Sequence, residues 1–109
     1  MRAVTAVTFE QPDGIERALE VEPGTSLMQA AVANGIRGIV AECGGQMMCA
    51  TCHVYVEDLD GELPGQSQDE IDMLDLAAAP VNGKSRLSCQ LVVGPSTRAV
   101  RARIPEVQV

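Results

Sequence analysis

Four cysteines, three of them within ten residues, constrain this chain more than any other feature. Five residues separate Cys43 from Cys49, two separate Cys49 from Cys52, and 36 lie between Cys52 and Cys89. Three thiols therefore come from one short segment and the fourth from far along the chain, so the fold has to bring two distant segments together. Four thiolates are the ligand set that a 2Fe-2S cluster requires.

Other uses of cysteine fit the spacing less well. Structural zinc sites usually combine two Cys-x2-Cys pairs, and only Cys49 and Cys52 have that spacing here. A disulfide framework is typical of secreted chains, and residues 1–10 lack the parts of a signal peptide. A thioredoxin-like pair would leave two cysteines without a role. A zinc-binding interaction module remains the alternative to an iron–sulfur centre.

The residues between the three clustered cysteines suit an anionic metal centre. Positions 38–50 show neither helical nor strand periodicity and are predicted to form a loop. Gly44 and Gly45 allow close backbone approach, so that N–H groups can turn towards the sulfur atoms. Ala50 and Thr51 are small and leave room between two ligands. We therefore expect these four residues to support a cluster loop.

Acidic residues dominate the same part of the chain. The net charge is −7, and positions 38–83 hold nine Asp or Glu residues and no Lys or Arg. Such a surface repels nucleic acid and anionic membranes and attracts basic protein surfaces. No stretch approaches the roughly 18 apolar residues that span a bilayer. We expect a cytoplasmic protein whose partners are proteins, with no nucleic acid and no membrane among them.

The remaining patterns predict a single α+β domain over residues 1–109. Pro12-Asp13-Gly14 is a turn signal between two strands, Gly35 can end a first helix, and Ser67 with Glu70 fits a capping box at the start of a second. The expected order is strands at 3–10 and 15–21, a helix at 27–34, a strand at 53–56, a helix at about 69–78, and strands at 87–93 and 99–104.

Three motifs together resemble those of the adrenodoxin-type 2Fe-2S ferredoxins. The run ECGGQMMCATCHVYV at positions 42–56 resembles their cluster loop, and DMLD at 72–75 and SRLSCQ at 85–90 resemble two further motifs in the same order. Plant-type relatives have four residues between the first two ligands, which excludes that branch. The resemblance implies a β-grasp (ubiquitin-like) fold that carries one 2Fe-2S cluster on Cys43, Cys49, Cys52 and Cys89.

The same resemblance implies an electron carrier, not an enzyme. Members of the family pass single electrons from a flavin-containing, NAD(P)H-dependent ferredoxin reductase to an acceptor protein. The acceptor is a cytochrome P-450 monooxygenase in many bacterial members and the iron–sulfur cluster assembly machinery in others. Assembly-type members tend to carry an extra cysteine at the position of Val54. We therefore favour the monooxygenase branch over assembly, and expect a monomer.

Partners of this family dock on acids of the short second helix. Asp72 and Asp75 match those positions, with Asp69 and Glu70 beside them. Glu42, just before the first ligand, stands where some monooxygenase-specific members carry Asp. The resemblance therefore implies that these five acids contact partners.

Two further residues, His53 and Arg86, lie near cysteines in the sequence. His53 is the only histidine, and a Rieske-type centre needs two. We therefore expect His53 to support the cluster loop, with a ring nitrogen bonded to loop backbone. Arg86 is either a surface charge or the partner of a nearby acid, and the sequence alone does not distinguish these roles.

Overall fold

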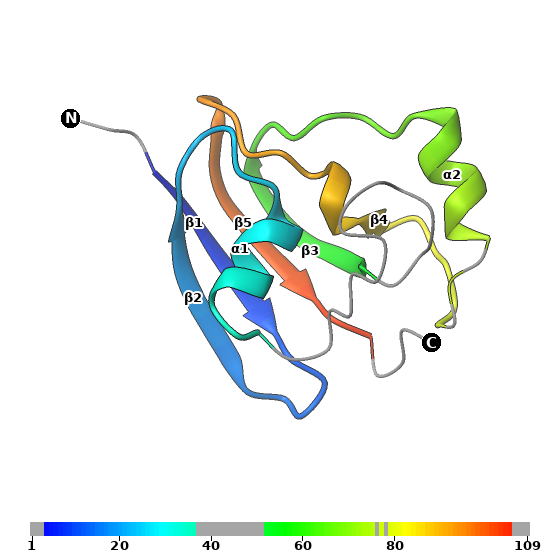
Figure 1. Ribbon diagram of the computed structural model, residues 1–109, viewed down its shortest axis with the longest axis horizontal. Helices are drawn as coiled ribbons and strands as arrows, with labels where there is room; N and C mark the ends of the chain where they lie inside the picture. The colour runs from blue at the N-terminus through cyan, green and yellow to red at the C-terminus, as the bar shows by residue number, and fades with distance from the viewer. Residues whose placement is uncertain (1–3, 37–51, 76, 78, 106–109) are drawn as a thin grey trace.

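Five strands form one sheet in the order β2-β1-β5-β3-β4 (Figure 1). The computed structural model describes residues 4–36, 52–75, 77 and 79–105. The elements are β1 (Thr5–Glu10), β2 (Glu16–Val21), α1 (Leu27–Ala33), β3 (His53–Gly61), α2 (Gln68–Leu74), β4 (Ser85–Leu87), the 3-10 helix η1 (Ser88–Gln90) and β5 (Thr97–Arg103). β1 and β5 run parallel, and the other paired strands run antiparallel. The α+β prediction is confirmed.

Local sequence signals explain the first half of the fold. At the β1–β2 turn the Gly14 N–H donates to the Gln11 carbonyl across 2.9 Å, and Gly14 has a φ of 85° that favours glycine. Ser26 caps α1 by accepting from the Gln29 N–H, while the Gln29 side chain accepts from the Ser26 N–H. Gly35, with a φ of 67°, follows the end of the helix as predicted.

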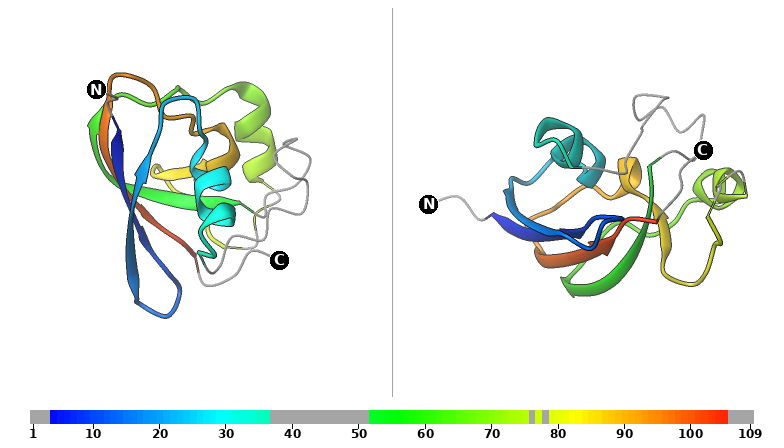
Figure 2. Two further views of the ribbon diagram at one scale, coloured as in Figure 1. Left: turned by 60° about the vertical axis from the view of Figure 1, so that its left-hand side comes forward. Right: turned by 90° about the horizontal axis from the view of Figure 1, so that it is seen from below.

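The main core lies between the sheet and α1. Figure 2 shows α1 and η1 over the same face of the sheet, with α2 beside its β4 edge. The core is mostly aliphatic, because only one phenylalanine and one tyrosine are present and tryptophan is absent. Its members include Val7, Phe9, Leu27, Ala31, Val54, Leu91, Val100 and Ala102. Within the described residues, no helix is long and apolar enough to cross a membrane.

Three predictions about the later elements were wrong. α2 ends at Leu74 instead of continuing to about position 78. β3 continues from His53 to Gly61 instead of ending at position 56, because it pairs with β5 from Tyr55 to Gly61. The strand predicted at 87–93 is the end of β4 followed by η1. The β3–β4 register, in which His53 pairs with Leu87, extends to a bond from the Ser88 N–H to the Cys52 carbonyl. The chain then turns, and the Leu91 N–H donates to the Ser88 carbonyl. Cys89 therefore lies in a 3-10 turn.

Gly61 closes the β3–β5 pair in a conformation that only glycine fits. Its φ is 100°, and it pairs with Thr97 just after an irregularity in the ladder. The Ser96 carbonyl accepts the Glu62 N–H across 3.0 Å and so lies over Gly61. A Cβ atom at position 61 would overlap that carbonyl oxygen. This close approach, as well as the positive φ, requires glycine.

Replacing Gly61 therefore tests the packing of this corner. We expect Gly61→Ala to lower the free energy of unfolding by about 3–5 kcal/mol, since left-handed strain and steric overlap add. Gly14→Ala is the matched control, because Gly14 also has a positive φ but has open space around it. That variant should lose only about 1–2 kcal/mol. Urea unfolding followed by circular dichroism measures both, and equal losses would contradict the overlap.

Candidate metal centre

Two of the four cysteines, Cys52 and Cys89, lie in one apolar cluster of the folded protein. Cys52 directly precedes β3 and Cys89 is the middle residue of η1. Both belong to one small apolar cluster with Met28, Leu74 and Leu87. Cys52 is 1% exposed and Cys89 is 9% exposed. The fold therefore brings together two thiols that are far apart in the sequence, and both are free thiols.

Ser88 holds the two segments in this position. Its backbone N–H donates to the Cys52 carbonyl oxygen across 3.0 Å, and its hydroxyl donates to the same oxygen across 2.8 Å. Ser88 is completely buried, so water does not compete with either bond. The residue next to Cys89 is thereby fixed to the residue that carries the second thiol.

The two thiols shift each other's ionisation in opposite directions. The neighbouring Cys52 thiol lowers the pKa of Cys89 to about 6, against the opposing effect of burial. The Cys89 thiol, helped by burial, raises the pKa of Cys52. Two thiols in one apolar cluster fit soft metal ligation and supply half of a four-thiolate set.

The rest of the predicted loop is outside the described part of the structure. This holds for both remaining ligands and for the small residues and the acid predicted to act beside them. They are Glu42, Cys43, Gly44, Gly45, Cys49, Ala50 and Thr51. Their roles stay predictions. Within the described residues, no cluster of three or more His, Cys, Asp or Glu side chains offers another metal site.

His53 is tied to β4 by one ring nitrogen. Its Nε2 atom lies 2.9 Å from the Ser85 hydroxyl oxygen, which also accepts the Asn82 N–H across 2.9 Å. Burial lowers the pKa of His53, which favours the neutral ring. The ring also meets Tyr55 edge to face at 4.8 Å. The predicted contact with loop backbone lies outside the described residues.

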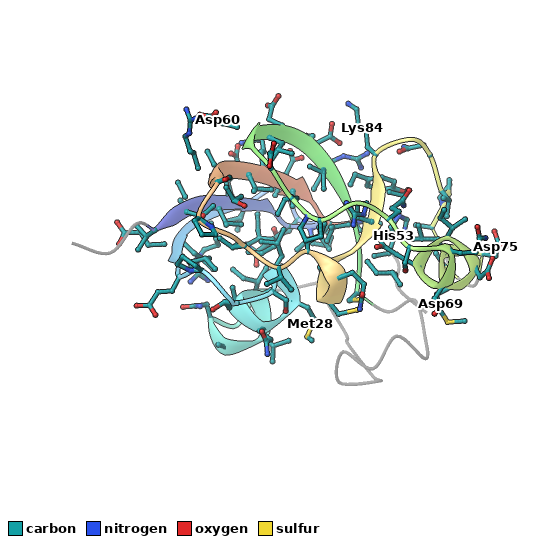
Figure 3. The ribbon with its side chains drawn as sticks, turned by 90° about the horizontal axis from the view of Figure 1, so that it is seen from above. Met28, His53, Asp60, Asp69, Asp75 and Lys84 are labelled. Carbon is teal, nitrogen blue, oxygen red and sulfur yellow. The ribbon has the colours of Figure 1, made fainter. Side chains whose placement is uncertain are left out.

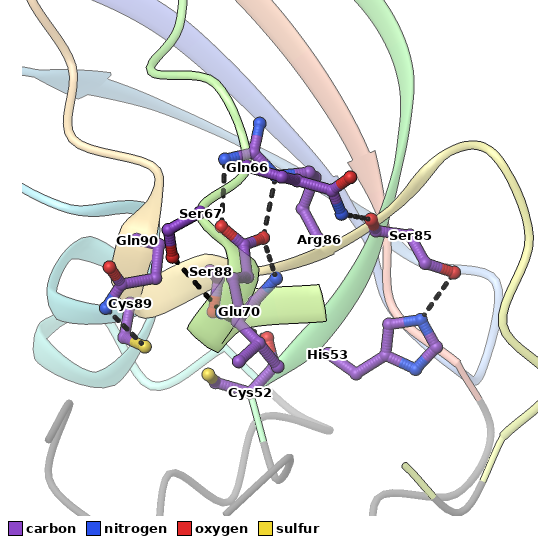
Figure 4. Close-up of polar contacts among 11 residues, drawn as sticks. Cys52, His53, Gln66, Ser67, Glu70, Ser85, Arg86, Ser88, Cys89 and Gln90 are labelled. Carbon is purple, nitrogen blue, oxygen red and sulfur yellow. Dashed lines mark hydrogen bonds and ion pairs between the residues drawn. The ribbon is translucent and has the colours of Figure 1, made fainter. Parts of the chain in front are cut away.

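Glu70 is turned into the protein, which removes it from the predicted docking surface. Its side chain is 1% exposed and forms a two-pronged ion pair with Arg86 (Figure 4). Arg86 Nε donates to Oε2 across 2.7 Å and Nη2 donates to Oε1 across 3.1 Å, while the Leu87 N–H donates to Oε2 across 3.0 Å. A carboxylate whose two oxygens are both bonded internally does not reach a partner. Arg86 is thus the partner of a nearby acid.

The ion pair also corrects the predicted capping box. Ser67 accepts the Glu70 N–H across 3.1 Å, so the first half of the box is present. The second half is replaced, because the Glu70 carboxylate binds Arg86 instead of the N-cap backbone. One feature of the sequence indicates that Glu70 is buried. Glu70 and Leu74 are four residues apart and share the buried face of α2.

The other acids of this region point outward. Asp69, Asp72 and Asp75 are exposed on α2 or at its C-terminal cap. Figure 3 shows Asp69 and Asp75 around the outer side of this helix. Gln68 Nε2 donates to Asp72 Oδ1 across 2.9 Å, which orients that carboxylate. α2 thus presents acids outward while Leu74 touches the apolar cluster around the two thiols.

Comparison with known proteins identifies the class to which this fold and thiol pair belong. A family model described as "2Fe-2S iron-sulfur cluster binding domain" matches residues 10–94. The chain is therefore a 2Fe-2S protein that carries one cluster of this type, as predicted. Its function is electron transfer, not enzymatic catalysis.

Individual relatives show to which branch of the 2Fe-2S proteins the chain belongs. Rhodocoxin from Rhodococcus erythropolis is 52% identical over 94% of this chain and 97% of that protein. A variant of putidaredoxin has a solved structure with a TM-score of 0.89 and 42% identity, covering 96% of this chain and all of that one. Putidaredoxin in a covalent complex with putidaredoxin reductase gives a TM-score of 0.86 at 44% identity, covering 93% and 98%. This chain belongs to the adrenodoxin-type 2Fe-2S ferredoxins, and the predicted β-grasp fold is confirmed.

Removing one partner of the buried Glu70–Arg86 ion pair should strongly destabilise the fold. We expect Arg86→Met to lower the free energy of unfolding by about 3–5 kcal/mol, because it leaves the Glu70 carboxylate buried and unpaired. Lys84→Met is the control, since it removes an exposed ion pair with Glu57 and should cost less than about 1 kcal/mol. Thermal unfolding of both variants measures the difference. Similar melting temperatures for the two variants would show that breaking the Glu70–Arg86 pair costs no more stability than breaking an exposed ion pair.

Proposed function

We propose that this ferredoxin passes single electrons from a flavin-containing, NAD(P)H-dependent ferredoxin reductase to a cytochrome P-450 monooxygenase. Cys43, Cys49, Cys52 and Cys89 hold the cluster, with Cys52 and Cys89 on the same iron. The position of Cys52 and Cys89 in one buried apolar cluster carries this proposal, because two soft ligands from distant segments lie together there. When bound, the 2Fe-2S cluster supplies one-electron chemistry.

The described residues around the proposed cluster have different roles. Leu74, Leu87 and Met28 surround the pair of thiols with apolar groups, which limits the access of water. Cys89 is the more exposed of the two cysteines, at 9% against 1%. Ser88 holds the distance between the two ligand-bearing segments through its bonds to the Cys52 carbonyl. This arrangement supports a rigid carrier that needs little rearrangement to accept an electron.

The outer side of α2 is the proposed docking surface. Asp69, Asp72 and Asp75 lie there, and Leu74 on the inner side touches the thiol cluster. A partner bound to these acids is therefore separated from the cluster by about one helix diameter, roughly 10 Å. The covalent complex of the relative putidaredoxin with its reductase supports a reductase as one partner. Glu42 stays in the proposed set, whereas the buried Glu70 does not.

The monooxygenase branch is supported over cluster assembly by the residue that follows His53. Val54 occupies this position and is completely buried in the main core. The chain therefore has no thiol where assembly-type relatives tend to carry one. A monomer in the cytoplasm, with residues 1–109 as one domain, completes the proposal. The parallel pairing of β1 with β5 supports one domain, because it joins the first and last strands.

Metal analysis tests the proposed cluster ligands. The purified protein should contain two iron and two sulfide ions per chain. Cys89→Ser should lose the cluster and much of the folding stability, because ligand loss and unfolding are linked. Absorption spectra and iron and acid-labile sulfide assays measure this, with Ser67→Ala as a control that removes a polar side chain outside the ligand set. A colourless protein with one zinc ion and no sulfide would contradict the assignment.

Electron-transfer rates test the docking surface. We expect Asp72→Asn and Asp75→Asn to slow reduction by a putidaredoxin-type reductase by roughly 3- to 10-fold at low ionic strength, because electrostatic steering is weakened. Asp60→Asn is the control, since Figure 3 places Asp60 at the opposite end of the molecule from α2. Stopped-flow kinetics at two salt concentrations measure the rates. Equal slowing in the control, or no salt dependence, would argue against docking on α2.

A further inference from the structure

Gln90 places a side-chain amide on one of the proposed ligand sulfurs. Its Nε2 atom donates to Cys89 Sγ across 3.4 Å, as the close-up in Figure 4 shows. Gln90 is half-buried and is the last residue of η1. Within the described residues, no other side-chain amide is bonded to a thiol. The contact joins a neutral donor to the sulfur that lies nearer to the surface.

The backbone of η1 does not depend on this contact. Ser88 is anchored to the Cys52 carbonyl by two bonds, and the Leu91 N–H donates back to the Ser88 carbonyl across 3.3 Å. The Leu91 carbonyl in turn accepts the Leu27 N–H at the start of α1 across 3.0 Å. Both ends of the turn are therefore held by backbone bonds. This leaves the Gln90 amide with an interaction that the fold itself does not require.

We propose that Gln90 sets the reduction potential of the cluster by donating a hydrogen bond to the Cys89 thiolate. The assignment rests on the proposed function, in which Cys89 is a cluster ligand. Reduction adds one electron, supplied by the flavin of the reductase, and no bond between heavy atoms forms or breaks. Four thiolates, two sulfides and two ferric ions carry a charge of about −2, which becomes about −3 on reduction. A donor aimed at a ligand sulfur stabilises the more negative state and raises the potential.

The Gln90 amide differs from the two other possible donors to Cys89, a water molecule and a lysine side chain. Water at the exposed edge of Cys89 would also donate, but its position would vary with the docking of a partner, whereas Gln90 is held by the chain. A lysine would add a charge and would stabilise the reduced state through a group that also attracts acids. The amide is neutral and does not titrate. The potential is therefore raised without a new charge beside the proposed docking acids.

Gln66 offers a matched control for a purely structural role. Its Nε2 atom also donates an amide hydrogen bond, but to the Ser85 backbone carbonyl across 3.0 Å. Removing this amide removes a hydrogen bond of the same chemical type without touching a sulfur. Any effect of lost packing or stability should therefore appear in Gln66 variants as well as in Gln90 variants. A change in potential should appear only in the latter.

The test is a potentiometric titration of the holoprotein, followed by visible absorption and electron paramagnetic resonance. At the midpoint potential of the parent protein, Gln90→Met should lower the ratio of reduced to oxidised cluster about 3- to 10-fold. A tenfold change corresponds to about 59 mV for a one-electron couple. Gln90→Glu, which keeps the shape but brings a negative charge, should lower the ratio further. Gln66→Met should leave it unchanged.

Three results would overturn the assignment of Gln90. They are an unchanged ratio in Gln90→Met, an equal change in Gln66→Met, or, if Gln90→Met does not assemble a cluster, an unchanged ratio in Gln90→Glu. A parent protein that lacks the 2Fe-2S spectrum would contradict the proposed function and this inference together. A parent with a normal spectrum and a potential that does not respond to Gln90 would contradict this inference alone.

Discussion

The paired hydrogen bonds from Ser88 to the Cys52 carbonyl are the constraint on which the rest of the site depends. They join two segments that 36 residues separate, at the point where β4 leaves the sheet. Because both donors meet one buried acceptor, the bond is insulated from water and fixes the distance between the thiols of Cys52 and Cys89. The sheet brings the two segments close together, and the two Ser88 bonds hold Cys52 and Cys89 in position as a pair of proposed ligands. The 3-10 turn that results also aims the Gln90 amide at Cys89.

α2 connects this ligand pair to the surface of the protein. Its inner side contributes Leu74 to the apolar cluster and Glu70 to the buried ion pair with Arg86, while its outer side presents aspartates to solvent. Arg86 lies three residues before Cys89, so the ion pair attaches the proposed docking helix directly to the ligand-bearing segment. A buried ion pair of this kind is worth little net stability compared with a well-packed apolar pair. Its geometric effect is to hold the helix in one orientation over the site.

The sequence predicted the features that depend on local chemistry and missed those that depend on distant contacts. The hairpin turn at Gly14 and the end of α1 at Gly35 follow from residues within one turn of each other, and both are found. The cysteine spacing led to the 2Fe-2S cofactor for the same reason, since ligand number and spacing can be read along the chain. The strand predicted after Leu87 failed because the chain turns at Ser88, whose carbonyl accepts the Leu91 N–H, instead of continuing along β3. Glu70 was assigned to the surface although it lies four residues from the buried Leu74, because its ion-pair partner Arg86 comes from a distant segment.

The central claim is that the fold brings Cys52 and Cys89 to one iron of a single cluster. The most direct measurement is X-ray diffraction from crystals of the holoprotein, with anomalous data collected on either side of the iron absorption edge. The account predicts two adjacent iron atoms, one of them bound by the sulfur atoms of both Cys52 and Cys89. Iron atoms bound without Cys89, or a single metal ion that scatters as zinc, would contradict it.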